Sequence, residues 1–219
     1  MDGTKGGPAP LAGAKIGVLV EHKFIPEEIS AYQTAFALLG AEVEFLSRIW
    51  YPNYTPKSAK FFSDVDPMDS QPWESAQSIE VSRDISTVKP SDYAAVIMSA
   101  NYTSVRLRSP DPPVSGNLSA FAQSAPVVAW FADAMSNRDL IKGALCHGLW
   151  ILTPNPKLLA GRQVVCNPVV LADILNCGAL VTLNPGVVVD HDLVTGYSKH
   201  EVVPFIQAIA RQILAPRPL

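Results

Sequence analysis

Three short, nearly continuous apolar runs constrain the fold of this chain more than any other feature of its sequence. They are residues 15–21, Tyr93–Met98 and Gly143–Cys146. Runs of this length without polar alternation are typical of parallel strands that are covered on both faces. Segments with helical spacing of apolar residues lie between them. Strands that alternate with helices predict a doubly wound, mostly parallel α/β sheet of the flavodoxin-like kind, with helices on both faces.

Proline and glycine indicate where several of the other elements begin and end. Pro26 occupies the first turn of a helix that Gly40 ends, and a strand over Glu42–Leu46 follows. Pro126 opens a second helix that runs to about Asn137. Later in the chain we expect strands near Val164–Cys166, Ala179–Thr182, Val187–Asp190 and Leu193–Thr195. We expect helices over His147–Leu152, Pro168–Cys177 and about Val203–Leu214.

We expect one α/β domain over residues 15–219, preceded by a flexible leader of Gly, Pro and Ala over residues 1–14. Many of the 19 prolines lie in this leader and in two irregular stretches near residues 48–90 and 99–125. The first stretch contains Trp50 and Trp73, which linkers rarely carry, so we interpret it as a structured insertion with aromatic anchors. Either insertion could form a lid, a tailored pocket or a dimer interface.

The composition excludes several classes of function. Charged residues make up only 17% of the 219 residues and the net charge is −3, which argues against a nucleic-acid-binding protein because phosphate contacts need a basic surplus. No apolar stretch approaches the ~18 residues of a membrane span, and the polar N-terminus lacks the apolar core of a signal peptide. Three cysteines without an export signal favour reduced thiols, so we expect a cytoplasmic protein that binds neither nucleic acid nor membrane.

The most informative segment runs from an apolar strand into Cys146, where a helix is expected to begin at once. A sharp strand-to-helix turn exposes the side chain at its apex at the carboxyl edge of the sheet, and Gly148 keeps side-chain bulk away from this turn. Backbone N–H groups of the helix start would favour the thiolate, so we expect a lowered pKa and a nucleophilic sulfur. The alternative is that Cys146 is a small buried apolar residue. Cys166 and Cys177 fit that structural role better, and the cysteine spacings match no metal site.

The segment Ala144-Leu145-Cys146-His147-Gly148 resembles the nucleophile elbow of the ThiJ/PfpI superfamily, which is related to the class I glutamine amidotransferases. Other segments resemble this family in the same order along the chain. They are Lys15–Val20 with Gly40-Ala41-Glu42-Val43, then Asp92–Ile97, then Leu159–Arg162 with Asn167-Pro168, and finally Val187–Asp190.

The resemblance implies that Glu28 is the carboxyl group that faces the thiol. A carboxyl group at this position can donate a hydrogen bond to a thiolate and move protons on a substrate. The alternative for Glu28 is a solvated residue in the first turn of a helix, and Glu21 is a weaker candidate for the same role. His147 directly follows the nucleophile and is the third expected catalytic residue. Other histidines are weaker candidates, among them His191 in a predicted hairpin turn, His22 and His200.

The chain departs from the family pattern near the expected oxyanion site. Family members often carry a Gly-Gly pair where this chain has Ser99 and Ala100, followed by Asn101. Small residues are retained, so we expect their backbone N–H groups to hold a developing oxyanion, and the Asn101 amide to bind a carbonyl or carboxylate. Gly148 and Asn167, which stands where many members have tyrosine, complete the expected substrate-binding set. Residues 101–106 lack the carboxylate of peptidase-type members, which argues against a peptidase.

The sequence therefore predicts a cysteine-nucleophile hydratase, lyase or hydrolase that acts on a small electrophilic molecule such as a reactive carbonyl. We expect no cofactor or metal, a small-molecule substrate as the ligand, and a homodimer or higher homo-oligomer. The alternative is a non-enzymatic redox sensor or chaperone-like stress protein that works through oxidation of Cys146. A flavin- or metal-binding protein is less favoured, because the chain offers neither a glycine-rich phosphate loop nor clustered ligands.

Overall fold

The computed structural model describes residues 7–49, 56–65, 75–109, 116–182 and 186–215. Seven strands form the main sheet in the order β10-β11-β7-β6-β1-β2-β5. Neighbouring strands are parallel except for β10, which runs antiparallel to β11. The predicted mostly parallel α/β sheet is thereby confirmed. The main-sheet strands are β1 (Lys15–Leu19), β2 (Glu42–Ser47), β5 (Arg83–Asp84), β6 (Ala95–Met98), β7 (Ile141–Leu145), β10 (Val187–Asp190) and β11 (Leu193–Gly196).

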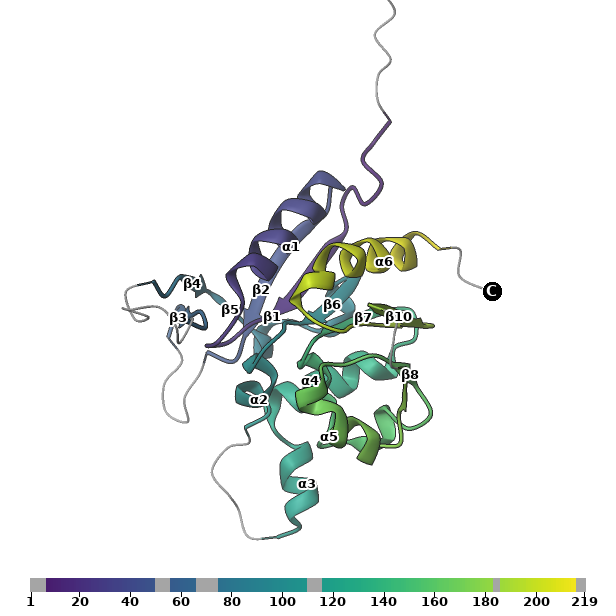
Figure 1. The fold of residues 1–219 in the computed structure, drawn as a ribbon. Coiled ribbons are helices and arrows are strands. Elements are labelled where there is room, and N and C mark those ends of the chain that lie inside the picture. Colours follow the sequence, from purple (N-terminus) through teal and green to yellow (C-terminus); the bar gives the residue numbers. More distant parts are fainter. Residues whose placement is uncertain (1–6, 50–55, 66–74, 110–115, 183–185, 216–219) are drawn as a thin grey trace, which may run out of the picture.

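Helices cover both faces of this sheet, as Figure 1 shows. On one face α1 (Pro26–Leu38) and α6 (Val202–Leu214) pack together, and their apolar side chains form one core cluster with Ile16, Val18 and Val194. On the other face Phe131, Leu149 and Ile174 pack against Leu19 and other strand residues. The remaining α-helices are α2 (Thr103–Leu107), α3 (Leu118–Gln123), α4 (Pro126–Ser136) and α5 (Leu171–Asn176).

Short 3₁₀ helices and two small strand pairs complete the described elements. The 3₁₀ helices are η1 (Ile85–Thr87), η2 (Pro90–Asp92), η3 (Gly148–Leu152), η4 (Pro156–Leu158), η5 (Pro168–Val170) and η6 (Lys199–Glu201). Strands β8 (Gln163–Val164) and β9 (Leu180–Val181) pair with each other outside the main sheet. Within the described residues, no helix is both long and apolar enough to cross a membrane.

The helix expected over His147–Leu152 is present, but it is a 3₁₀ helix and not an α-helix. The chain forms only the five-residue 3₁₀ helix η3 after Cys146. Pro154 keeps the chain from continuing as an α-helix, because it has no N–H to donate to the carbonyl of Trp150. The helix whose dipole was expected to act on the thiol is therefore only five residues long.

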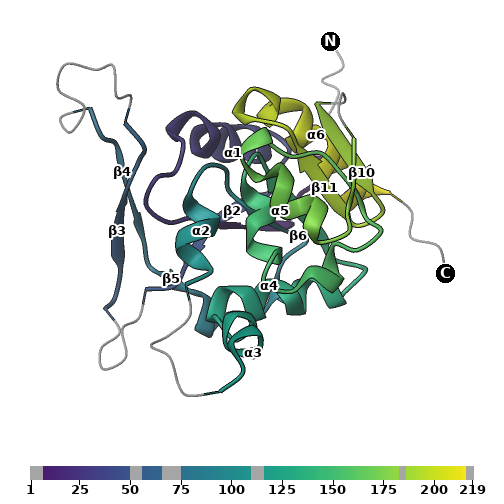
Figure 2. The same cartoon turned by 60° about the horizontal axis from the view of Figure 1, so that its bottom comes forward.

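The first insertion contains a separate antiparallel pair, β3 (Ala59–Phe62) and β4 (Ser78–Val81). Figure 2 shows this pair at one side of the molecule, beyond β2 and β5. Its end lies against the segment that follows β1, because Phe24 and Ser63 form a β-bridge. Trp50 and Trp73, the expected aromatic anchors, lie outside the described residues.

Part of the expected flexible leader is packed in the structure. Leu11 is only 2% exposed, and its backbone N–H donates a hydrogen bond to the carbonyl of Leu39. Gly40 approaches Ala9 so closely that a Cβ atom at residue 40 would lie 2.6 Å from the Ala9 side chain. Residues 9–14 therefore pack against the end of α1. Burial of the apolar Leu11 side chain stabilises this packing.

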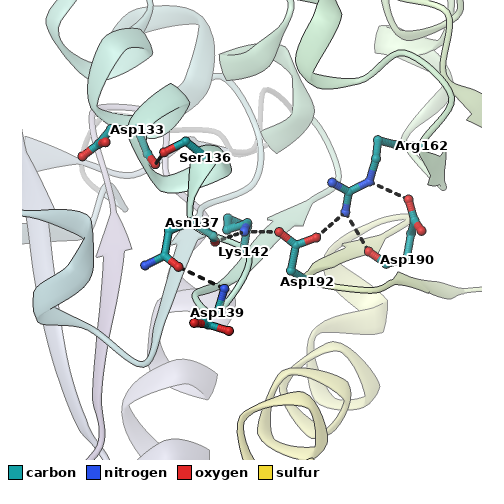
Figure 3. A network of polar contacts seen from close by, with 8 residues as sticks. All are labelled: Asp133, Ser136, Asn137, Asp139, Lys142, Arg162, Asp190 and Asp192. Carbon is teal, nitrogen blue, oxygen red and sulfur yellow. Dashed lines mark hydrogen bonds and ion pairs between the residues drawn. The ribbon is translucent and has the colours of Figure 1, made fainter. Parts of the chain in front are cut away.

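A buried network of charges lies at the amino ends of the strands (Figure 3). Lys142 of β7 is fully buried, and its ammonium group pairs with Asp192 and donates to the carbonyl of Asn137 at 2.7 Å. Arg162 binds Asp192 and Asp190 from the other side, at 2.7 and 2.6 Å. These contacts hold the β10–β11 turn against β7.

Candidate functional site

The carboxyl ends of three central strands bring the site together. Leu19, Met98 and Ala144 are aligned across β1, β6 and β7. The loops that leave these strands, including the one at Cys146, therefore meet at one edge of the sheet. Ligand sites of open α/β sheets usually lie at this edge.

Cys146 has a backbone conformation that non-glycine residues rarely adopt, with φ of 61°. Such a conformation costs roughly 1–3 kcal/mol and persists only where the surroundings enforce it. Here the Cys146 N–H donates to the carbonyl of Gly196 at 2.8 Å, and its own carbonyl accepts from the Asn167 N–H at 3.2 Å. The strained elbow is thus held between β11 and the segment after β8.

The sulfur of Cys146 is buried among hydrogen-bond donors, and the residue is only 8% exposed. Burial raises the pKa of the thiol to about 11, although hydrogen bonds from the backbone of Asn101 and His147 and from the Asn167 side chain act to lower it. The nearby charge of Glu28 raises it further. The expected lowered pKa is therefore wrong, because desolvation of the sulfur outweighs the donors.

Glu28 lies in the first turn of α1 and is completely buried. Its Oε1 accepts a hydrogen bond from the Tyr32 hydroxyl at 2.7 Å, and both carboxyl oxygens lie 3.0 Å from the Ala100 nitrogen. Burial raises the pKa of Glu28 to about 7, against the lowering effect of these two hydrogen bonds. The solvated alternative is thereby excluded, and the expected carboxyl group interacts with the thiol of Cys146.

Tyr32 is a residue of this site that sequence reasoning missed. It is fully buried and stands four residues after Glu28, on the same face of α1. The stripe Glu28, Tyr32 and Phe36 has helical spacing, and this spacing is the signal that could have identified Tyr32.

Ser99 and Ala100 do not have the free N–H groups that were expected for an oxyanion. The Ser99 N–H and hydroxyl both donate to the carbonyl of Leu19. The Ala100 N–H donates to Glu28. These donors are occupied because a buried carboxyl group and a strand-end carbonyl each need a partner.

Asn101 contributes its backbone to the site, and its side chain is held elsewhere. Its φ is 62°, and its backbone N–H points at the Cys146 sulfur. The side-chain nitrogen donates to the carbonyl of Lys23 and to Oδ2 of Asp64, each at 2.8 Å. The expected binding of a substrate carboxylate by this amide is therefore not supported.

His147 is buried beside the nucleophile and lies among aromatic rings. Its imidazole centre is 5.3 Å from the rings of both Tyr102 and Trp150. Burial lowers the pKa of the ring, so His147 is neutral near pH 7. Its Nδ1 atom is buried and has no hydrogen-bond partner among the residues that the structure describes.

Gly148 and Asn167 have different places around the elbow. A Cβ atom on Gly148 would lie 2.8 Å from the carbonyl oxygen of Met98, so glycine lets η3 approach β6 closely. Asn167 directs its side chain toward Cys146 and His147. Its Oδ1 also accepts the Val169 N–H at 3.0 Å, which fixes the amide at the start of η5.

Comparison with known proteins agrees with this arrangement. Residues 115–212 match the sequence profile of the DJ-1/PfpI family. Over this stretch the chain is similar to the DJ-1/PfpI family. The matched stretch includes Cys146, His147, Gly148 and Asn167, whereas Glu28 and residues 99–101 precede it. No curated protein matches the chain significantly by sequence.

Solved structures share the fold over nearly the whole chain. A two-domain protein from Anabaena variabilis, with DJ-1/ThiJ/PfpI-like and ferritin-like domains, matches with a TM-score of 0.69 and 20% identity over 91% of this chain and 48% of its own. The chain thus spans about half of that relative. A ThiJ/PfpI domain protein from Brachyspira murdochii has a TM-score of 0.65 and 13% identity, covering 94% and 99% of the two chains. DJ-1 from Schizosaccharomyces pombe matches with a TM-score of 0.63 and 15% identity over 93% of this chain and 93% of its own. These low identities show the fold alone.

The weaker sequence candidates lie apart from the hydrogen bonds around the thiol. Glu21 accepts the His22 N–H and pairs with Arg106. The Nδ1 atom of His22 accepts the N–H of Phe62. His191 lies in the β10–β11 turn, as predicted, and His200 lies in η6. Cys166 and Cys177 are buried free thiols.

A cavity of about 690 Å³ lies at the opposite edge of the sheet from the thiol. Residues at the amino ends of β7 and β11 line it, among them Ile141 and Asp192. The described residues contain no group of three or more His, Cys, Asp or Glu that could hold a metal ion.

Proposed function

We propose that this chain is a cysteine-dependent hydratase, lyase or hydrolase that acts without a cofactor on a small electrophile such as a reactive carbonyl. Cys146 is the covalent nucleophile, Glu28 is the proton shuttle, and His147 and Asn167 contact the reacting molecule. The observation that carries the proposal is the pair of buried groups, a strained cysteine with three donors around its sulfur and a carboxyl group that interacts with it.

The two pKa values indicate how the proton moves. A thiol with a pKa near 11 is protonated at neutral pH, so its attack needs a base at the sulfur. Glu28, with a pKa near 7, is partly ionised at that pH and can serve as this base. These protonation states differ from the expected ones, which were a thiolate beside a protonated carboxyl group.

In the first step the sulfur attacks the carbonyl carbon while the Glu28 carboxylate takes the thiol proton. A C–S bond forms, the carbonyl π bond breaks, and its electron pair moves to oxygen. We assign the stabilisation of that oxygen to the N–H groups of Asn101 and His147, which interact with the sulfur in the resting protein. Glu28 then returns the proton to the oxygen, and a hemithioacetal results.

The experiment compares the three cysteines of the chain. Purified Cys146→Ser, Cys166→Ser and Cys177→Ser are assayed against a panel of 2-oxoaldehydes, isonitriles and small activated esters. We expect turnover to fall by about a thousandfold or more in the Cys146 variant alone, because serine is a much weaker nucleophile than cysteine. The other two are matched controls, since both are buried free thiols. Normal turnover by Cys146→Ser would contradict the nucleophile assignment.

A redox-sensing or chaperone-like role through Cys146 is the second candidate. The donors around the sulfur could also hold a sulfinate. The raised pKa weighs against this role, because oxidation by peroxide proceeds through the thiolate. Selective oxidation of Cys146 in mass spectra after mild peroxide, together with no turnover of any substrate in the panel, would favour it.

We also propose that the protein works in the cytosol as a homodimer or larger homo-oligomer and binds neither nucleic acid nor membrane. Three free cysteines are compatible with a reducing compartment. Large apolar side chains at the surface, among them Leu38, Leu118 and Val203, are compatible with further burial at an interface. Light scattering coupled to size exclusion measures the oligomeric state directly.

A further inference from the structure

A hydrogen bond joins the first insertion to Asn101, whose backbone interacts with the nucleophile. Asp64 follows β3, and its Oδ2 atom accepts from the side-chain nitrogen of Asn101 at 2.8 Å. Its Oδ1 atom pairs with the Lys23 ammonium group at 3.0 Å. Burial would raise the pKa of Asp64, but the hydrogen bonds from Asn101 and Lys23 keep it below its ordinary value, so this acceptor is an anion at neutral pH.

The left-handed backbone conformation of Asn101 has to be held by contacts of its side chain. Its φ of 62° lies in the left-handed region, where asparagine is tolerated but not strongly held. The direction of its N–H depends on this conformation, and that N–H points at the Cys146 sulfur. The side-chain amide has two acceptors, Asp64 and the carbonyl of Lys23, and both lie outside the loop that carries Asn101.

The other acceptor of the Asn101 side chain is the carbonyl of Lys23. The φ of Lys23 is 71°, so the carbonyl that accepts from Asn101 belongs to a second left-handed residue. The Lys23 N–H donates to the carbonyl of Phe62 at 2.8 Å, which ties Lys23 to β3. Two left-handed residues therefore meet at the end of β3, and Asp64 contacts the side chains of both.

We infer that Asp64 is a positioning residue for the nucleophile: by holding the Asn101 side chain, it aims the Asn101 N–H at the Cys146 sulfur. The inference rests on the proposed function of Cys146 as the nucleophile. It gives the first insertion a role in the chemistry, although none of its described residues needs to touch the substrate for this role.

The test measures how fast iodoacetamide alkylates Cys146 in the full chain, quantified by mass spectrometry of the Cys146 peptide from about pH 7 to about pH 10. Below the pKa of the thiol, the thiolate fraction sets this rate. In Asp64→Ala we expect the rate to fall by roughly three- to tenfold across the range, because one donor to the anionic sulfur is weakened. Asp64→Asn keeps an acceptor oxygen for Asn101 and should react at nearly the wild-type rate.

The matched control is Glu80→Gln, which removes a charge from the same strand pair, where Glu80 binds the Ser58 hydroxyl. It should leave the rate and its pH profile unchanged. An Asp64→Ala rate equal to that of Glu80→Gln would overturn the inference. A faster rate would overturn it as well, because a merely loosened structure exposes the sulfur. Equal slowing in Asp64→Asn and Asp64→Ala would exclude the hydrogen bond as the cause.

This measurement separates the inference from the proposed function, because alkylation needs no turnover. If Cys146→Ser retains wild-type turnover while Asp64→Ala slows alkylation, the proposed function fails, and only the effect of Asp64 on the reactivity of the Cys146 thiol stands. If Cys146→Ser abolishes turnover while Asp64→Ala alkylates normally, the positioning role fails and the proposed function stands.

Discussion

At the scale of single residues, burial decides the chemistry of the two central groups. Cys146 and Glu28 both have raised pKa values, and for both the first cause is loss of water. Three donors around the sulfur only partly offset this effect. The ionisation of Glu28 near pH 7 therefore controls both the base that the proposed reaction needs and the electrostatic field at the thiol.

Replacement of Glu28 by glutamine should stabilise the protein in a pH-dependent way. Because the folded-state pKa of Glu28 is raised from 4.5 to about 7, the folded state holds this proton more tightly than the unfolded chain does. The stabilising effect of the proton is complete below about pH 4.5 and is lost as the pH rises through about 7. The free energy of unfolding of Glu28→Gln, relative to wild type, should therefore increase by about 3 kcal/mol between acidic pH and pH 8.

Urea denaturation at several pH values measures this difference. Glu27→Gln is the matched control, because Glu27 is the exposed neighbour of Glu28 in the same turn of α1. A stability difference for Glu28→Gln that stays constant with pH would show that Glu28 titrates normally in the folded protein.

At the scale of elements, the site depends on how closely η3 approaches β6. The hydroxyl of Ser104 in α2 donates to the carbonyl of His147 at 3.0 Å, so α2 also contacts this turn. Gly148 lies where these elements meet, against the carbonyl oxygen of Met98. The position of Cys146 thus follows from backbone-to-backbone packing, which leaves no room for a side chain at residue 148.

Replacement of Gly148 by alanine should destabilise the fold by roughly 2–3 kcal/mol, because the new Cβ atom would lie 2.8 Å from a strand carbonyl that cannot move freely. Thermal and urea unfolding measure the loss. Gly7→Ala is a suitable control, since a Cβ atom there meets nothing within 4 Å. Equal stabilities of the two variants would mean that η3 can shift away from β6 without loss.

At the scale of the whole molecule, the two edges of the sheet carry different kinds of polar groups. The carboxyl edge holds the thiol, the carboxyl group of Glu28 and their donors. The amino edge holds the network of Lys142, Asp192, Arg162 and Asp190 that Figure 3 shows. Every charge in that network is paired, which is typical of groups that hold structure together.

Removal of Asp192 should destabilise the molecule without changing the reactivity of Cys146. The Asp192→Ala variant leaves the fully buried ammonium group of Lys142 without its carboxylate, which costs about 3–5 kcal/mol. Urea denaturation measures the loss, and the double variant Lys142→Met with Asp192→Ala should recover part of it. The iodoacetamide rate at Cys146 should match wild type while the variant is folded. A changed rate would show that the two edges are coupled.

The sequence by itself determined the class of the fold and predicted Cys146 as the candidate nucleophile. Apolar runs of strand length are legible without a structure, because burial on both faces removes polar residues from them. The strand–turn position of Cys146 is equally local. The resemblance to the family supplied Glu28, and the helical spacing of His147–Leu152 located η3 without showing that it is a 3₁₀ helix.

Only the tertiary structure decided the protonation and hydrogen bonding of the site. The Ala100 N–H is occupied by a carboxylate 72 residues away, and the Asn101 amide is held by Asp64, 37 residues away. The burial that raises the pKa values of Cys146 and Glu28 likewise comes from packing between distant segments. Periodicity and turn residues report local conformation, whereas desolvation and donor occupancy depend on which distant segments meet, so the chain had to fold before they were defined.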